Sequence, residues 1–243
     1  MELVVIGSSS SGNGYVLNGT HEALCIEAGT KLIETKKALG FNLQKVRGCI
    51  VTHSHNDHAR YAKDYAQAGI KVLALETVLE AKGITRNAMA IQIGNAYKLG
   101  GFVVMPFALQ HDVPCVGYVI THSECGKVVF ITDTFACNYR FKGVNNYLLE
   151  ANYSDEILEA NIEAGMVSPA MRDRLLTSHF DLSNSIRFLL TSDRTALQKV
   201  VLVHLSNGNS NEAKFVRQVR EAIGKPVYAA AGGMVIPLNA SVI

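Results

Sequence analysis

The sequence predicts an α/β (α+β) fold, in which two mixed β-sheets are covered by outer helices. Three observations predict it. Strand-like and helix-like apolar patterns alternate along the chain at short intervals. The 243 residues are 48% hydrophobic, which is enough to bury a full core. Neither an internal repeat nor a polar linker divides the chain, so we expect a single domain over residues 1–243.

The strand-like segments are short, rich in Val, Ile, Leu or Phe, and end at Gly, Pro or polar residues. They are residues 3–6, 15–17, 22–27, 46–52, 71–74, 102–108, 116–121, 128–132, 146–150, 200–203, 227–230 and 235–238. Helical patterns cover residues 31–39, 53–68, 76–82, 154–190 and 211–223, the fourth broken at Gly165 and Pro169. Asn209 or Ser210, followed by Glu212, predicts a capping box for the last helix.

Composition excludes several classes of protein. No run of about 18 apolar residues occurs, so we expect no membrane-spanning segment. The first residues lack a basic leader and resemble a strand, and the five cysteines are scattered without a C-x-x-C pair. Buried, reduced thiols in a cytoplasmic protein are the simplest interpretation. A net charge of +2 gives no strong field for binding nucleic acid, although it does not exclude a polymeric substrate.

The chemistry is concentrated in the segment His53-Ser54-His55-Asn56-Asp57-His58, directly after an apolar strand. His53 and His55 alternate by two in extended chain, so both imidazoles face one side and can bind one ion. Asp57 and His58 come one turn later and can reach a second ion. The alternative is a polar loop in which Asp57 caps a helix, but a cap requires no histidines.

Further ligands are expected at the ends of later strands, because one loop cannot fill two coordination spheres. His111, Asp133 and His204 each follow an apolar strand directly or within a few residues. Strand ends are where a rigid sheet brings distant residues to one point. A carboxylate such as Asp133 can bridge two cations about 3.5–4 Å apart.

The pattern H-x-H-x-D-H, followed by a later His, Asp and His, resembles the metallo-β-lactamase fold superfamily. This resemblance implies a four-layer αββα sandwich with metals at one edge. Residues 7–13, 150–153 and 204–209 resemble the YycJ-like (WalJ) branch, which is similar to tRNase Z and phosphodiesterase members and includes DNA exonucleases. The resemblance covers essentially the whole chain.

Carried over residue by residue, the resemblance implies two divalent metal ions. His53, His55 and His111 would hold the first, Asp57, His58 and His204 the second, and Asp133 would bridge them. Zinc is the expected ion, with manganese or iron as alternatives, because mixed His and Asp ligands suit all three. The bridging aspartate favours, by family analogy, a member that hydrolyses phosphodiesters.

This sequence departs from the branch where a His-Leu-Ser-Asn element is usual. Here the segment reads Ser178-His179-Phe180-Asp181-Leu182-Ser183-Asn184, which puts Asp181 where the proton-donating histidine is expected. A proton donor at neutral pH should titrate near neutrality, so we predict His179 as the general acid. Asp57 and His179 are therefore the predicted catalytic residues. The alternative is that His179 merely precedes a helix cap formed by Asp181 or Ser183.

The predicted function is phosphodiester hydrolysis by a dinuclear metal-bound hydroxide, with a DNA or RNA exonuclease-like nuclease as the first hypothesis. A phosphodiesterase for a small cyclic nucleotide is the second, and a thioester hydrolase is more distant. A non-enzymatic binder conflicts with the intact metal positions. A homodimer is left open.

Other polar residues are expected to be structural. We interpret His21 and His122 as surface residues. Arg172, Arg174, Lys214, Arg217 and Arg220 suit solvated helix faces. The turn over residues 8–14 could present backbone N–H groups to phosphate, or simply join two strands.

Overall fold

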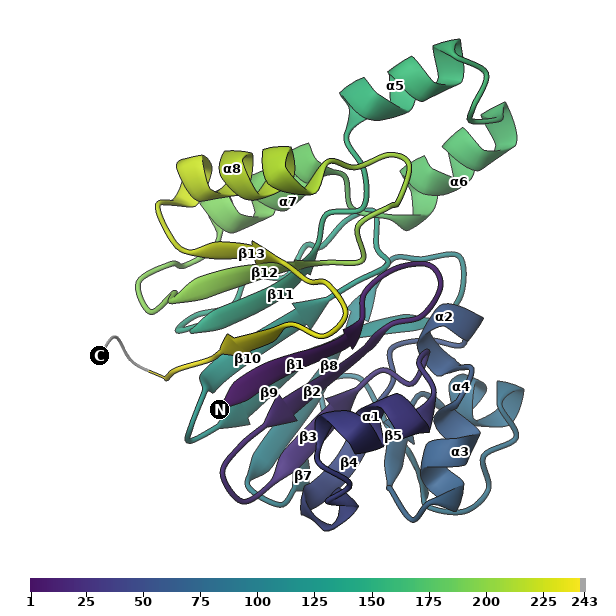
Figure 1. Cartoon of the computed structure of the whole chain (residues 1–243), viewed down its shortest axis with the longest axis vertical. Helices are drawn as coiled ribbons and strands as arrows, with labels where there is room; N and C mark the ends of the chain where they lie inside the picture. The colour runs from purple at the N-terminus through teal and green to yellow at the C-terminus, as the bar shows by residue number, and fades with distance from the viewer. Residues whose placement is uncertain (241–243) are drawn as a thin grey trace.

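Two seven-stranded β-sheets pack face to face in the computed structural model, which describes residues 1–240 (Figure 1). The last three residues of the expected domain, 241–243, lie outside the described residues. The first sheet has the order β14 (Val235–Pro237), β1 (Glu2–Gly7), β2 (Gly14–Asn18), β3 (Ala23–Ile26), β4 (Val46–Ile50), β5 (Val72–Ala74), β6 (Ala88–Ala90). The second has the order β13 (Val227–Ala229), β12 (Lys199–Val203), β11 (Asn146–Glu150), β10 (Gly126–Ile131), β9 (Cys115–His122), β8 (Phe102–Leu109), β7 (Tyr97–Leu99).

Each sheet is antiparallel in one half and parallel in the other. In the first sheet the pairs from β3 to β6 are parallel, and in the second the pairs from β10 to β13 are parallel. The carboxyl ends of parallel strands lie at one edge of a sheet, which is where ligand sites form in such folds. The expected mixed sheets are confirmed.

Helices cover the two outer faces of the sandwich (Figure 1). The first sheet is covered by α1 (Leu32–Ala38), α3 (Ala62–Gln67) and α4 (Glu76–Ala81), and the second by α7 (Leu182–Thr191) and α8 (Glu212–Ile223). A 3-10 turn, η1 (Leu43–Lys45), precedes β4, and a short helix, α2 (Asn56–Ala59), follows it. The pair α5 (Asp155–Glu163) and α6 (Pro169–Ser178) projects beyond the sheets at the top of Figure 1.

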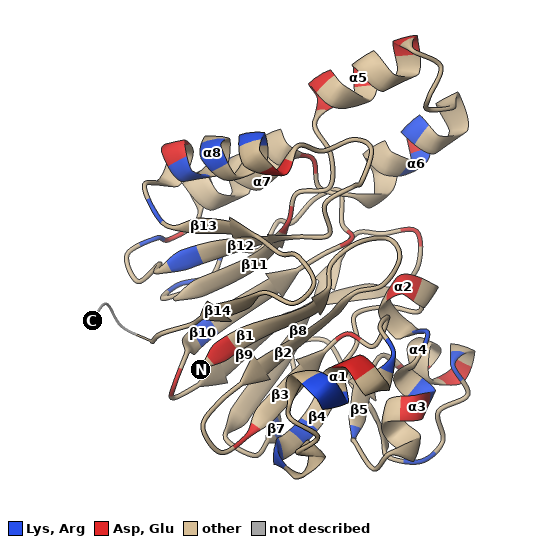
Figure 2. Ribbon diagram, in the orientation of Figure 1, with Lys and Arg blue, Asp and Glu red and all other residues tan. Residues whose placement is uncertain are grey.

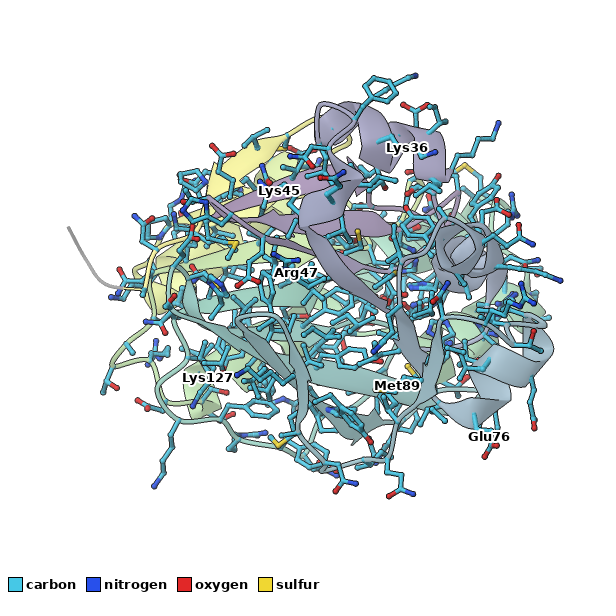
Figure 3. The ribbon with its side chains drawn as sticks, turned by 90° about the horizontal axis from the view of Figure 1, so that it is seen from below. Lys36, Lys45, Arg47, Glu76, Met89 and Lys127 are labelled. Atoms are coloured by element: carbon cyan, nitrogen blue, oxygen red, sulfur yellow. The ribbon has the colours of Figure 1, made fainter. Side chains whose placement is uncertain are left out.

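Alternation of side chains along the strands produces three apolar layers. Leu3 and Val5 of β1 point between the sheets with Phe102 and Phe130, whereas Val4 lies in the outer apolar layer, on the face that α1 covers. Figure 3 shows side chains filling the space between the sheet ribbons, with Arg47 on β4 and Lys127 on β10 labelled. Three apolar layers require four layers of secondary structure, so the predicted αββα sandwich is confirmed. Each fully buried Leu, Ile or Phe in them contributes about 1.5–3 kcal/mol.

The structure corrects several local predictions. The edge strands β6 and β7 were not predicted, because their sequences, Ala-Met-Ala and Tyr-Lys-Leu, contain none of the β-branched residues that mark the other three-residue strands. The helix expected over residues 53–68 is divided into α2 and α3. Asn211 caps α8 by accepting from the Lys214 N–H, so the predicted box from Asn209 or Ser210 is wrong.

The five cysteines are buried and free, as predicted, and burial raises the pKa of the Cys25 thiol to about 12. Within residues 1–240, no helix has both the length and the apolar character needed to cross a bilayer. Acidic and basic residues are interspersed on α1, α3 and α8 (Figure 2), which agrees with the absence of a basic stripe in the sequence.

Candidate metal centre

The predicted ligands meet at one end of the sandwich, on loops that leave both sheets. The segment His53–His58 follows β4, His111 follows β8, Asp133 follows β10 and His204 follows β12. Glu27, Asp133 and His204 have the left-handed φ values 65°, 51° and 55°. Such a conformation costs a residue other than glycine about 1–3 kcal/mol, and it is typical of functional sites. Here it turns each side chain out of its strand toward the same point.

His53, His55 and His111 form the first group. Their ligand nitrogens lie within 4.8 Å of one another, and His55 Nδ1 faces His111 Nε2 at 3.3 Å. Burial lowers the pKa of His53 well below its usual value and also lowers that of His111, so both rings are held neutral. Neutral imidazoles are the form that binds metal.

Hydrogen bonds fix which nitrogen of His53 carries the proton. The Thr52 hydroxyl donates to Glu27 Oε1 at 2.6 Å, so its oxygen accepts from His53 Nδ1–H at 2.9 Å. This leaves His53 Nε2 without a proton, buried, and without a hydrogen-bond partner. In the same way, His111 Nδ1–H donates to the Ser178 carbonyl at 3.1 Å, which leaves Nε2 as the acceptor. The unpartnered His53 Nε2 fits a cation, whereas His111 Nε2 also lies 3.3 Å from His55 Nδ1 and 3.0 Å from Asp112 Oδ1.

Asp57, His58 and His204 form the second group. Asp57 Oδ2 lies 3.1 Å from His58 Nε2 and 3.2 Å from His204 Nε2. Burial opposes charge on both rings, but Asp133 and the neighbouring carboxylates raise the pKa of His204 to about 10 and that of His58 well above its usual value. Protons on these rings balance the surplus of carboxylates. A divalent cation in the same place would balance it without them.

Asp133 lies between the two groups. Its ligand oxygen is within 4.8 Å of ligand nitrogens from His53 and His58, one residue from each group. Its Oδ2 is 3.0 Å from His58 Nε2 and accepts from the Thr132 hydroxyl at 2.6 Å. Although burial opposes the charge, His204 and His58 hold the pKa of Asp133 well below its usual range. A buried, ionised carboxylate between two histidine groups fits the predicted bridging position.

Two buried carboxylates, Glu27 and Glu150, support the site and were not predicted as site residues. Glu27 Oε1 accepts from Thr52 and lies 3.4 Å from His58 Nδ1. Glu150 Oε1 lies 3.0 Å from His204 Nδ1, and its Oε2 accepts from the Phe180 N–H at 3.1 Å. Each is an acidic residue at the end of a fully buried strand. This is the same context that identified Asp133 in the sequence, so the signal was present.

His179 lies in the cluster, and Asp181 lies outside it. His179 Nδ1–H donates to Glu150 Oε1 at 2.7 Å, and the ring stacks on His204 with centroids 5.4 Å apart. Burial opposes charge on His179, but Glu150 and then Asp133 raise its pKa. Asp181 instead caps α7 by accepting from the Asn184 N–H at 3.0 Å. With Nδ1 held by Glu150, the Nε2 atom of His179 is left for a substrate.

The serine- and glycine-rich turn after β1 supports the site. The Ser8 hydroxyl accepts from the His204 N–H at 2.9 Å, and the Asn13 N–H donates to the Asp57 carbonyl at 2.7 Å. A Cβ atom on Gly29 would lie 1.7 Å from that carbonyl oxygen, so only glycine allows this approach. These contacts indicate a structural role for the turn.

A cavity of about 350 Å³ opens onto the cluster. Six of the eight predicted ligand and catalytic residues line it: His55, Asp57, His111, Asp133, His179 and His204. Met171, Arg174 and Leu175 of α6 also line it, so Arg174 does not belong to a purely solvated face as predicted. A larger hollow of about 670 Å³ shares Leu205 and Ser206 with this cavity but contains none of the predicted ligands.

Of the two histidines interpreted as surface residues, His21 is exposed but His122 is buried. His122 Nε2 lies 2.9 Å from Glu22 Oε1, a residue 100 positions away. That pairing, at the other end of the sandwich, is invisible in local sequence.

The fold and this cluster of histidines and aspartates define a metal-dependent hydrolase. The chain belongs to the metallo-beta-lactamase superfamily, whose family model matches residues 9–143. It is 27% identical to the exodeoxyribonuclease YycJ of Bacillus anthracis, over 85% of this chain and 83% of that protein. It is 23% identical to the exodeoxyribonuclease WalJ of Streptococcus pneumoniae, over 85% and 82%. The solved structure of Zn²⁺-bound PqqB from Methylobacterium extorquens has a TM-score of 0.75 at 15% identity, over 98% of this chain and all (100%) of that one, and so shares the fold.

Proposed function

We propose that this protein is a nuclease that hydrolyses phosphodiester bonds with two divalent metal ions. The observation that carries the proposal is the position of Asp133, buried and ionised between the two histidine groups. The names of the relatives YycJ and WalJ support the nuclease assignment. Zinc is the first ion to test, since PqqB, a protein of the same fold, was solved with zinc bound.

The ligand sets would be His53, His55 and His111 for one ion, and Asp57, His58 and His204 for the other, with Asp133 shared. Bound there, the ions would supply a nucleophile from water at neutral pH and neutralise charge on the phosphate. Asp57 and Asp133 add negative charge, which keeps the net charge of a loaded site low enough for a product anion to leave.

His179 is the proposed general acid. Glu150 holds its Nδ1–H at 2.7 Å, which fixes the ring orientation and directs Nε2 to the substrate side. A charged imidazole can give its Nε2 proton to the departing alkoxide, and Glu150 stabilises that charged form beforehand. The raised pKa of His179 is consistent with a ring that carries this proton at neutral pH.

Metal dependence and substrate class are tested together. Protein with a measured metal content is incubated with labelled single- and double-stranded oligonucleotides, with cyclic mononucleotides and with bis(p-nitrophenyl) phosphate, each with and without chelator. We expect oligonucleotide cleavage that is lost with chelator and restored by added metal. Loaded protein that cleaves none of these substrates would refute the proposal.

The role of His179 is tested by varying the leaving group. For His179→Ala we expect a loss of about 10²–10⁴-fold with an alkoxide leaving group, and a much smaller loss with p-nitrophenolate, which needs little protonation. Asp181→Asn is the matched control, because Asn also caps helices well. Equal losses with both leaving groups would show that His179 is not the acid.

A cyclic-nucleotide phosphodiesterase is the second candidate. The cavity of about 350 Å³ favours it, since this lies at the small end of the volume range of ligand sites and suits a single small ligand. Cleavage of cyclic mononucleotides without cleavage of oligonucleotides would select this candidate.

A further inference from the structure

A second, smaller pocket of about 280 Å³ lies beside the metal centre. Its polar and exposed members are Phe135, Asn138, Arg140, Asn184 and Arg187. Building on the proposed function, we infer that this pocket binds the nucleotide next to the scissile phosphodiester, as part of a single strand. The proposal therefore specifies a polymeric substrate, whereas a cyclic mononucleotide has no second nucleotide to place there.

Two short connections fix the pocket next to the catalytic groups. Phe135 follows Asp133 by two residues, and its N–H donates to the carbonyl of Gln110, which precedes His111. Phe180 directly follows His179, and its N–H donates to Glu150 at 3.1 Å. The pocket is therefore adjacent, through the backbone, to the bridging aspartate and the proposed acid.

The pocket has a positive charge and no lining acid. Arg140 and Arg187 are both exposed, and neither forms an ion pair within residues 1–240. Arg140 donates to the carbonyls of Cys137 and Tyr139, and its guanidinium lies 5.5 Å from the centre of the Phe188 ring. Arg187 donates to the amide oxygen of Asn184. These contacts orient the guanidinium groups without neutralising them.

Some cations elsewhere on the surface have acidic partners, whereas others, such as Arg86 and Arg217, form no ion pair within residues 1–240. Arg47 pairs with Glu22, Lys37 with Glu34 and Lys214 with Glu156. The pocket is distinguished by its combination of two arginines unpaired in the described chain with an exposed phenylalanine and no lining acid, in a chain whose net charge is only +2. Arginine binds phosphate with its planar fork of donors, which suits a backbone phosphate of a strand.

Phe135 adds an aromatic surface to this charge. Its side chain is 40% exposed, although it lies only two residues from the buried Asp133. An aromatic ring beside cationic side chains is the arrangement that proteins use for single strands, because every base can stack on it. A lone exposed phenylalanine needs no explanation, but one at the entrance of a cationic pocket beside a catalytic centre does.

The charge is tested with Arg187→Gln, and with Arg217→Gln on the outer helix α8 as the matched control. The readout is the ratio of kcat/KM for a short single-stranded oligonucleotide to kcat/KM for bis(p-nitrophenyl) phosphate. Losing one charged hydrogen-bond donor should lower this ratio about tenfold or more in R187Q and leave it unaltered in R217Q. An equal ratio in both variants overturns the proposal.

Binding is tested separately from catalysis with a fluorescent phosphorothioate-linked oligonucleotide, which retains its charges and resists cleavage. For a single strand, each lost phosphate contact should reduce the slope of log Kd against log salt concentration by about 0.7. We expect this reduction in R187Q and not in R217Q. Phe135→Ala should weaken binding roughly tenfold or more at any salt concentration, with the slope unchanged, because stacking carries no charge.

Failure of the two proposals can be told apart. If loaded protein hydrolyses no phosphodiester, the proposed function fails, and the binding experiment still decides whether the pocket takes a single strand. If the protein hydrolyses cyclic mononucleotides and neither binds nor cleaves oligonucleotides, the pocket proposal is refuted while phosphodiester chemistry stands.

Discussion

The polar clusters at the two ends of the sandwich differ in whether the chain itself supplies their hydrogen-bond partners. At the end away from the metal centre, Glu22 accepts from His122, from the Gly101 N–H at 2.8 Å and from Arg47 at 3.1 Å. At the other end, His53 Nε2 has no partner and imidazole nitrogens of His55 and His111 face each other. Glu22 finds its partners within the chain, whereas the histidines at the metal centre are arranged around a group that the chain does not supply.

The backbone shows the same difference. Glu27, Asp133 and His204 at the strand exits of the metal centre adopt left-handed φ values, and the other two non-glycine residues within 1–240 that do so, Phe41 and Asn87, lie before η1 and β6. Strain of about 1–3 kcal/mol per residue must be offset by packing of the surrounding sheets. At the metal centre, unlike at Glu22, left-handed backbone and an unpartnered imidazole nitrogen occur together, where a bound cation could compensate for both.

The largest expected effect follows from removing the residue shared by both ligand groups. Asp133→Ala should lower kcat/KM on bis(p-nitrophenyl) phosphate by about 10³-fold or more and reduce the bound metal, because several kcal/mol of metal stabilisation are lost. Metal analysis and turnover measure it, with Asp64→Ala on the exposed face of α3 as control. Full metal content with normal turnover would show that Asp133 has no such role.

A second prediction separates the two ends directly. Removing metal should lower the free energy of unfolding by about 4 kcal/mol per site, when the free metal had been about 1,000 times its Kd. In hydrogen exchange, protection should fall in residues 53–58, 109–112, 132–136 and 204–209. Residues 19–22, 45–47 and 122–126, at the other end, should keep theirs. A uniform loss of protection at both ends would show that metal does not stabilise the metal centre preferentially.

The smallest expected effect concerns Glu22, at the end of the sandwich away from the metal centre. Although burial opposes it, the Gly101 N–H, His122 and Arg47 hold the pKa of Glu22 below its ordinary value. This stabilisation is therefore present above the pKa of Glu22 in the unfolded chain, and it is lost as the pH falls through the lowered pKa of the folded state. Glu22→Gln should lower the free energy of unfolding by about 1–2 kcal/mol at pH 7 and by less at pH 3.

Urea unfolding at the two pH values measures this difference, with Glu2→Gln as an exposed control. The same loss at both pH values would mean that packing, and not charge, accounts for the contribution of Glu22.

Strand exits made most of the site predictable from sequence. His111, Asp133 and His204 were found because each follows an apolar strand, and a sheet brings such positions together. Glu27 and Glu150 share that context, but they orient histidines instead of facing the cavity. The ligand pattern therefore did not identify them. The signal for supporting residues is therefore the same as the signal for ligands.

The features that the sequence did not predict depend on tertiary contacts. His122 is buried because Glu22 reaches it from a strand of the other sheet. Arg174 lines the cavity only because the α5 and α6 pair is placed beside the site, and helical periodicity does not encode that placement. The choice between His179 and Asp181, by contrast, was made from local sequence, and Asp181 is indeed used as the cap of α7.

The seven predicted ligands come from both sheets, and the last of them is His204. Residues 53–58 follow β4 of the first sheet, whereas His111, Asp133 and His204 follow strands of the second. During synthesis, a growing chain that has not reached β12 therefore holds only an incomplete set, however much of the first sheet has formed. Under the proposed two-ion site, metal capture should be one of the last events in the maturation of this protein, and an early stop in translation would release a chain that lacks a proposed ligand of the second ion.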